Sequence, residues 1–144
     1  MAVREFAEVS AGVRATVAAH AQAQDEGRTK DMVALYLPDA VVEIPGFDPL
    51  VGADAILAAF SRPGWRPDPS RPQRHMVGNT LLTEWDDHTA RATSDVVMLV
   101  HDGTAWSVAV VARYHDTFEE SAGRWLLRRR VDEYVGDPPD RRSR

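Results

Sequence analysis

The sequence contains no cysteine, which excludes a disulfide scaffold, a thiolate metal site and a cysteine nucleophile. It has no apolar run of the roughly 18–20 residues that a transmembrane helix needs. Charged residues within Met1–Ala11 also interrupt the apolar stretch that a signal peptide would have. We therefore expect a cytoplasmic protein without a membrane partner. A formal net charge of −5 gives no general attraction to nucleic acid, so no nucleic-acid partner is expected.

Common catalytic and metal-binding motifs are missing as well. No glycine-rich phosphate loop follows a predicted strand, and no Gly-x-Ser-x-Gly nucleophile elbow occurs. Four histidines, at positions 75, 88, 101 and 115, are spaced 13 or 14 residues apart. This spacing is typical of one histidine per strand or turn and does not match a metal site. We therefore expect neither a metal ion nor another cofactor.

The composition is that of one globular domain. Its 144 residues, 44% of them hydrophobic, are enough to form a single core. The predicted domain spans residues 1–135. The polar segment 136–144 contains two prolines and is predicted to be a flexible tail.

Helices are predicted only in the first part of the chain. Apolar residues from Phe6 to Val17 recur at steps of three to four, as on one face of a helix, and Gly27 marks its end. The β-branched run at Ala40–Ile44 predicts a short strand after the second helix. The predicted helices span Phe6–Gln24, Thr29–Tyr36 and Ala53–Phe60.

The second half of the chain predicts a long loop and then four strands. Ser61–Arg74 contains four prolines and no periodic pattern, which is typical of a lid or binding loop. Helices that are separated in sequence from an antiparallel meander predict an α+β fold. Long strands must twist, so we expect a curved antiparallel sheet with three helices enclosing a pocket on its concave side. The predicted strands span His75–Thr83, Thr89–Val100, Ala105–Glu119 and Arg124–Tyr134.

Several short segments resemble one known family in their order and spacing. They are Asp25–Gly27, Ala34–Val42, Gly52–Ile56, His75–Asn79, Tyr114–Phe118 and Gly123–Trp125. Together they resemble the SnoaL-like branch of the nuclear-transport-factor-2-like superfamily, over about Val9 to Val135. The resemblance implies a cone-shaped α+β barrel. It implies no single activity, because this superfamily includes dehydratases, isomerases, cyclases, hydrolases and binding subunits.

The resemblance points to Asp25 and His75 as candidate catalytic residues. In members similar to scytalone dehydratase and hexachlorocyclohexane dehydrochlorinase, the residues at these two places form an acid/base dyad. Asp25 would hold one imidazole nitrogen of His75, and the other nitrogen would exchange protons with the substrate. The alternative is structural: Asp25 would cap the following turn, and His75 would merely end a strand.

Five further residues are candidate substrate-binding residues: Tyr36, Trp65, Asn79, Asp95 and Tyr114. If His75 points inward, strand alternation places Asn79 on the same face, where it would orient a substrate oxygen or brace a turn. Tyr114 would donate its hydroxyl to a substrate or pack in the core. Asp95 would face the pocket or lie exposed, and Trp65 would cover the ligand.

Other polar residues are expected to be structural. Asp116 with Arg129 predicts an ion pair between neighbouring strands. His20 lies on the apolar face of the first helix, where packing is the simpler role.

This chain differs from two groups of the family at positions that carry their chemistry, and the differences narrow the expected activity. Members similar to ketosteroid isomerase carry a catalytic Asp just before a proline, where this chain has Ile44. Members similar to scytalone dehydratase have a second histidine and a tyrosine where this chain has Thr93–Asp95 and Gln24. The first departure argues against a ketosteroid isomerase mechanism. The second argues against scytalone as the substrate.

We therefore expect a cofactor-free lyase or isomerase that acts on a small apolar ring compound. Asp25 and His75 would carry out elimination or isomerisation, as in a dehydratase, a dehydrohalogenase or an isomerase. The alternatives are a polyketide cyclase or hydrolase of the same fold, and a non-catalytic binding or interaction domain. The resemblance also implies a homodimer that pairs through the outer face of the sheet. The residues expected on that face are Val108, Val110, His115, Leu126 and Arg128.

Overall fold

The computed structural model describes residues 4–136 of the chain. The helices are α1 (Phe6–Asp25), α2 (Thr29–Val33) and α3 (Ala53–Phe60). The strands are β1 (Tyr36–Glu43), β2 (Leu50–Val51), β3 (Gln73–Trp85), β4 (Thr89–His101), β5 (Trp106–Ser121) and β6 (Arg124–Tyr134). The predicted tail spans residues 136–144, and residues 137–144 of it lie outside the described part of the chain.

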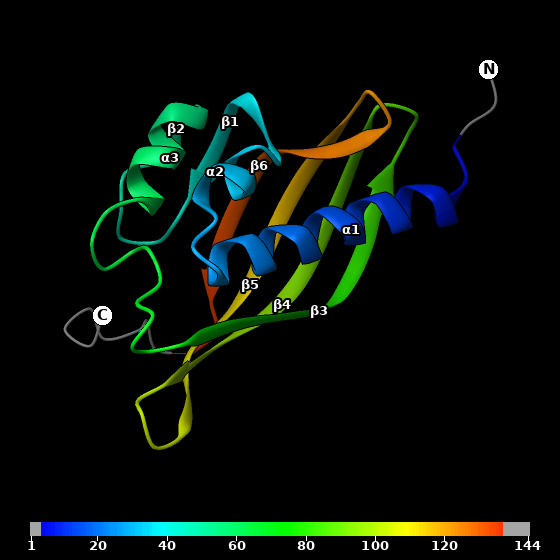
Figure 1. The fold of residues 1–144 in the computed structure, drawn as a ribbon. Helices are drawn as coiled ribbons and strands as arrows, with labels where there is room; N and C mark the ends of the chain where they lie inside the picture. Colours follow the sequence, from blue (N-terminus) through cyan, green and yellow to red (C-terminus); the bar gives the residue numbers. More distant parts are fainter. Residues whose placement is uncertain (1–3, 137–144) are drawn as a thin grey trace.

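The six strands form one curved, open sheet in the order β2-β1-β6-β5-β4-β3 (Figure 1). Strands β3 to β6 form the predicted antiparallel meander. Strand β1 pairs in parallel with β6, and β2 pairs with β1 in antiparallel orientation. The fold is therefore the predicted α+β class, with one parallel pair that the sequence analysis did not anticipate. The sheet does not close into a barrel.

Helix α1 crosses the sheet and provides much of the core (Figure 1). Its residues Val9, Val13 and Val17 are buried with Phe118 and Leu127 of the sheet. Burial of apolar side chains of this size contributes about 1.5–3 kcal/mol each. Within residues 4–136, no helix is long and apolar enough to cross a membrane.

The start of β1 differs from the prediction. Helix α2 ends at Val33, and Tyr36, predicted to be helical, is the first residue of β1. Tyr36 lies opposite Leu127 of β6, and pairing with that strand overrides the local helical pattern. Pro38 falls where the β1–β6 register shifts, which is a position where a strand tolerates proline.

Strand β3 contains a bulge that reverses which side chains point inward. Before the bulge, Gln73 is buried and His75 half-buried. The register with β4 shifts between Gly78 and Leu81, and Asn79 has a positive φ of 50°. After the shift, Thr80 is buried and Asn79 is exposed. One extra residue is enough to invert the alternation of a strand.

Strand β6 has a comparable irregularity. Trp125 and Leu127 are buried, so strict alternation would bring Arg129 inward. The register with β5 shifts near Phe118, and Arg130 becomes the buried residue instead. Arg130 therefore lies opposite Asp116, whereas Arg129 lies opposite Thr117.

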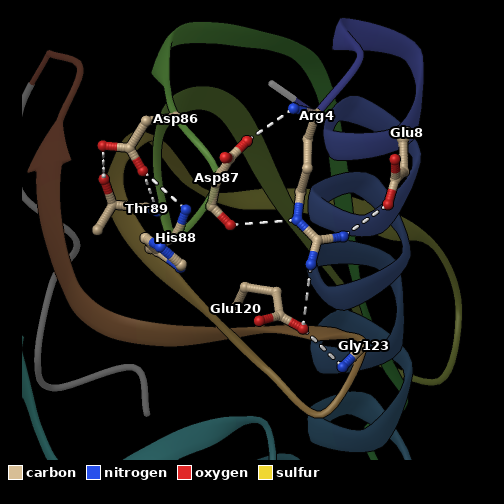
Figure 2. A network of polar contacts seen from close by, with 8 residues as sticks. All are labelled: Arg4, Glu8, Asp86, Asp87, His88, Thr89, Glu120 and Gly123. Carbon is tan, nitrogen blue, oxygen red and sulfur yellow. Dashed lines mark hydrogen bonds and ion pairs between the residues drawn. The ribbon is translucent and has the colours of Figure 1, made fainter. Parts of the chain in front are cut away.

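At the end of the sheet formed by the β3–β4 and β5–β6 turns, Arg4 ties α1 to both turns (Figure 2). Its backbone N–H donates to Asp87 Oδ1 at 2.7 Å, and its Nε donates to the Asp87 carbonyl at 3.1 Å. The guanidinium also pairs with Glu8 at 2.7 Å and with Glu120 at 3.6 Å. This set of contacts is called the turn-end network below.

Candidate active site

A cavity of about 700 Å³ lies at the other end of the sheet, between the end of α1, the segment 61–72 and the concave face. Its volume suits a small organic ligand. Much of its wall is apolar, and its polar groups come mainly from α1, the segment 61–72, the start of β3 and the end of β6. The apolar lining includes Val42, Ile44, Phe60, Val96, Met98, Val100 and Val110.

Asp25 and His75 meet at one wall of this cavity. Asp25 is the last residue of α1, and His75 lies near the start of β3. The His75 Nδ1–Asp25 Oδ1 distance is 2.6 Å, so the expected hydrogen bond is present. The His75 backbone N–H donates to Asp25 Oδ2 at 2.7 Å, and Gln73 Nε2 donates to Oδ1 at 3.2 Å. Three donors thus hold one carboxylate in a fixed orientation.

This arrangement selects one form of the His75 imidazole. An ionised carboxylate only accepts hydrogen bonds, so Nδ1 carries the proton that lies between His75 and Asp25. In the neutral ring, Nε2 then has a free lone pair, and no described residue forms a hydrogen bond with it. The side chains of Asp25 and His75 are 5% and 10% exposed. His75 also lines the cavity, so its geometry suits a base that receives a proton from a ligand.

A second polar group lies beside the dyad. His20 Nε2 is 2.7 Å from the Tyr36 hydroxyl, and His20 Nδ1 is 3.4 Å from Arg130 Nη1. Burial, then the positive charge of Arg130 and, least, the neighbouring His75 hold the pKa of His20 well below its usual value. His20 is therefore a neutral imidazole between a guanidinium and a phenol.

Arg130 is itself paired with Asp116. Its Nε and Nη2 donate to the two carboxylate oxygens at 2.8 and 2.9 Å. The guanidinium also stacks 3.8 Å from the ring centroid of Tyr114, a cation–π contact. Burial raises the pKa of the Tyr114 hydroxyl, so this side chain stays neutral. The prediction that Asp116 pairs with Arg129 is wrong: Arg129 binds Glu43 instead.

The predicted binding loop lines the mouth of the cavity. Trp65 contacts Phe47 and Phe60 edge to face, with ring centroids 5.0 and 5.4 Å apart. Arg62 lies 4.9 Å from the Trp65 ring. Trp65, Tyr36 and Tyr114 all line the cavity. Their contact with a substrate remains a prediction.

Asn79 and Asp95 do not line the cavity, and the structure corrects their predicted position. Asn79 Nδ2 donates to Asp95 Oδ2 at 3.0 Å, and Arg113 Nε donates to Asp95 Oδ1 at 2.9 Å. The hydrogen bonds from Arg113 and Asn79 lower the pKa of Asp95. The β3 bulge turns Asn79 to the outer face of the sheet, where it braces Asp95.

The outer face also differs from the expected one. Val110 lies opposite Met98, which lines the cavity, so Val110 is not on the predicted pairing surface. Val108 lies opposite Leu99, on the same face as Met76, and is 59% exposed. Met76 and Val111 are exposed on this outer face, and both lie opposite Val97 in the ladder.

Sequence reasoning gave no site role to His20, Gln73 or Arg130. A signal existed for His20, because it lies on the same helical face as buried Val13 and Val17 and is the only polar ring there. No sequence signal identified Arg130 within Arg128–Arg130, since the choice depends on the β6 irregularity. Within residues 4–136, no group of three His, Asp or Glu side chains is placed to hold a metal ion.

Comparison with known proteins agrees with this fold. A family model, the SnoaL-like domain, matches residues 5–131. No curated protein matches the chain. A structure from Catenulispora acidiphila in complex with S-DNPA is 26% identical, with a TM-score of 0.79; the match covers 89% of this chain and 94% of that one.

Two structures from Novosphingobium aromaticivorans are also similar. An NTF2-like protein with a cystatin-like fold is 20% identical, with a TM-score of 0.84 and coverage of 96% and 89%. A protein provisionally named a scytalone dehydratase is 18% identical, with a TM-score of 0.74 and coverage of 92% and 91%. At these identities, the likeness is one of fold alone.

Proposed function

Because the chain belongs to the family of SnoaL-like domains, we propose that it is a small-molecule lyase or isomerase that uses Asp25 and His75 as an acid/base dyad. The substrate is a small apolar ring compound held in the cavity. The reaction is an elimination or an isomerisation, of the dehydratase, dehydrohalogenase or isomerase type.

One observation carries the proposal: His75 Nδ1 is bonded to Asp25, and its ring lines the cavity. His75 Nε2 takes a proton from a substrate carbon, and Asp25 stabilises the imidazolium that forms. In an elimination, the electron pair of the broken C–H bond forms a double bond as the leaving group departs. In an isomerisation, the proton returns to another carbon. Such a base contributes about 10²–10⁴-fold to the rate.

The surroundings of the dyad support a small organic substrate. The cavity of about 700 Å³ falls in the range for small-molecule sites, and most of its side chains near β4 and β5 are apolar. A similar structure is a complex with a ligand, S-DNPA, and another is provisionally named a scytalone dehydratase. Both names are compatible with small-molecule chemistry in this fold.

The test measures proton abstraction, which elimination and isomerisation share. The protein is incubated in D₂O with a panel of cyclic ketones, and deuterium next to the carbonyl is followed by NMR. We expect His75→Gln to slow exchange by about 10²–10⁴-fold. Asp25→Asn should slow exchange as well, because it removes the charge that orients and stabilises the imidazole.

His88→Gln is the matched control, because His88 lies exposed in the β3–β4 turn at the other end of the sheet. It should exchange deuterium as the wild type does. A ketone that binds in the cavity without exchange, with equal affinity for wild type and His75→Gln, would favour the alternative of a non-catalytic binding domain.

We also propose that two copies pair through the outer face of the sheet. Met76 and Val111, 59% and 39% exposed, are the apolar side chains that support this surface. Sedimentation at micromolar concentration should give twice the monomer mass of 16.0 kDa. Met76→Glu should shift the protein towards the monomer, and a wild-type monomer would exclude the pairing.

A further inference from the structure

The contacts between Arg130, His20 and Tyr36 form a directed chain of hydrogen bonds that the dyad mechanism does not use. All three side chains line the same cavity as His75. His20 and Arg130 are each 3% exposed, and Tyr36 is 4% exposed. Polar groups buried this deeply need defined partners, so the direction of each hydrogen bond can be worked out from its neighbours.

Arg130 sets the direction of this chain. A guanidinium can only donate, so the His20 Nδ1 that faces it at 3.4 Å presents its lone pair. Since His20 is neutral, its single ring proton is on Nε2. Nε2–H therefore donates to the Tyr36 hydroxyl oxygen at 2.7 Å.

The proton of the Tyr36 hydroxyl is then available to another acceptor. His20 cannot accept it, because its Nε2 lone pair is absent in this tautomer. Among the described residues, no other side chain or carbonyl forms a hydrogen bond with this hydroxyl. Burial raises the pKa of Tyr36, so the phenol keeps its proton and acts as a donor.

We propose that Tyr36 is a catalytic hydrogen-bond donor to a carbonyl oxygen of the substrate, with His20 and Arg130 as positioning residues. The substrate class is therefore a carbonyl compound whose acidic C–H lies next to the carbonyl or is conjugated with it. This assignment rests on the proposed function for its chemistry, but it can be measured by binding alone.

The two proposals combine in one balanced step. His75 Nε2 removes the proton, the C–H electron pair forms a carbon–carbon double bond, and the carbonyl π electrons move to oxygen. The hydrogen bond from Tyr36 then stabilises a full negative charge in place of a partial one. When the enolate collapses, the imidazolium proton goes to the leaving group or to another carbon. Tyr36 ends the cycle with its own proton.

The test uses 4-nitrophenolate as an enolate mimic and nitrobenzene as its counterpart without the oxyanion. Affinities of both are measured for wild type, Tyr36→Phe and His75→Gln, under conditions where the phenolate is ionised. We expect Tyr36→Phe to weaken phenolate binding by about 10- to 100-fold, as for one hydrogen bond to a charged group. Nitrobenzene binding should stay within about threefold, which shows that the cavity is intact. Equal phenolate affinity in wild type and Tyr36→Phe would overturn the proposal.

His75→Gln separates this proposal from the dyad. This variant should still bind 4-nitrophenolate more tightly than nitrobenzene, even though it loses the deuterium exchange of ketones. Loss of the preference in His75→Gln but not in Tyr36→Phe would assign the oxyanion to His75 and overturn the role of Tyr36.

A second pair of ligands is neutral. Acetophenone and α-methylstyrene differ only in that the ketone oxygen is replaced by CH₂, so the ratio of their affinities is compared in wild type and Tyr36→Phe. The ketone should lose affinity relative to the alkene in Tyr36→Phe, and an unchanged ratio contradicts the donor.

Discussion

The two ends of the sheet both hold arginine–carboxylate networks, but they differ in their access to water. Beneath the cavity, the side chains of Arg130 and Asp116 are 3% and 1% exposed. In the turn-end network, those of Arg4 and Glu8 are 32% and 58% exposed (Figure 2). The chemistry of the pairs is the same, so the comparison isolates the effect of removing them from water.

Because the Arg130–Asp116 pair is buried, disturbing it costs free energy. The pair is therefore well suited to hold neighbouring side chains in place. A buried ion pair adds little net stability, yet the loss of one partner leaves an uncompensated charge. An exposed pair keeps its hydration, so forming or breaking it changes the free energy of unfolding little. The buried network thus serves to orient Tyr36 and Tyr114, whereas the turn-end network only ties α1 to two turns.

The largest effect is expected for Arg130→Met. It leaves the Asp116 carboxylate buried without its bidentate partner, and breaking a buried pair costs about 3–5 kcal/mol. Urea unfolding at neutral pH measures the loss. Arg129→Met is the matched control on the same strand, because Arg129 is 53% exposed in its pair with Glu43. It should lose at most about 1 kcal/mol. Equal losses for the two variants would refute the comparison.

A smaller effect is expected where α1 crosses the sheet between the two ends. An added Cβ at Gly12 would lie 2.4 Å from Trp125 Cδ1. Replacing glycine by alanine in a helix normally raises the free energy of unfolding by roughly 0.5–1 kcal/mol, but overpacking a core lowers it by about 1–3 kcal/mol. We expect Gly12→Ala to lower the free energy of unfolding, as measured in urea. Gly78→Ala in β3 meets nothing within 4 Å and should show no such loss. A stabilised Gly12→Ala would mean that Trp125 can move aside.

The sequence predicted the sheet meander and α1 well, because their patterns are long and regular. His75 was correctly placed facing inward, since the part of β3 before the bulge alternates strictly. The same rule placed Asn79 on the wrong face, and the predicted partner of Asp116 was Arg129, whereas the structure has Arg130. In both strands, a single irregularity inverts the pattern beyond it. Such irregularities leave no clear mark in a single sequence.

The start of β1 shows a second limit of the sequence analysis. Tyr36 continues an apolar helical pattern, and only its pairing with Leu127, far along the chain, makes it part of a strand. The hydrogen bond between His20 and Tyr36 depends on that position. Tyr36 was a candidate substrate-binding residue in the sequence analysis, but its partners come from tertiary structure.

A third test sharpens the comparison through pH. The pKa of His20 is lowered in the folded state by burial, by Arg130 and by His75. On acidification, His20 therefore binds a proton in the unfolded chain at a pH where it stays neutral in the folded chain. The free energy of unfolding falls as the pH drops below about 6.5. The slope from this one group is at most about 1.4 kcal/mol per pH unit. Urea unfolding between pH 5 and 7 should show a shallower slope for His20→Gln than for wild type.

His88→Gln provides the contrast at the turn end, since His88 is exposed there. It should leave the slope unchanged. A slope that is equal in wild type and His20→Gln would mean that His20 takes up its proton equally in the folded and the unfolded chain, so that burial does not keep it neutral.

The smallest effect is expected at the turn-end network. Arg4→Ala removes the side-chain contacts to Glu8, Glu120 and the Asp87 carbonyl, but it keeps the backbone hydrogen bond to Asp87. Because these groups regain water, the free energy of unfolding should fall by at most about 1 kcal/mol. Added salt screens exposed charges, so the difference from wild type should shrink in 1 M NaCl. A salt-independent loss as large as that of Arg130→Met would show that exposure does not distinguish the two ends, and that Arg4 holds α1 on the sheet by packing instead.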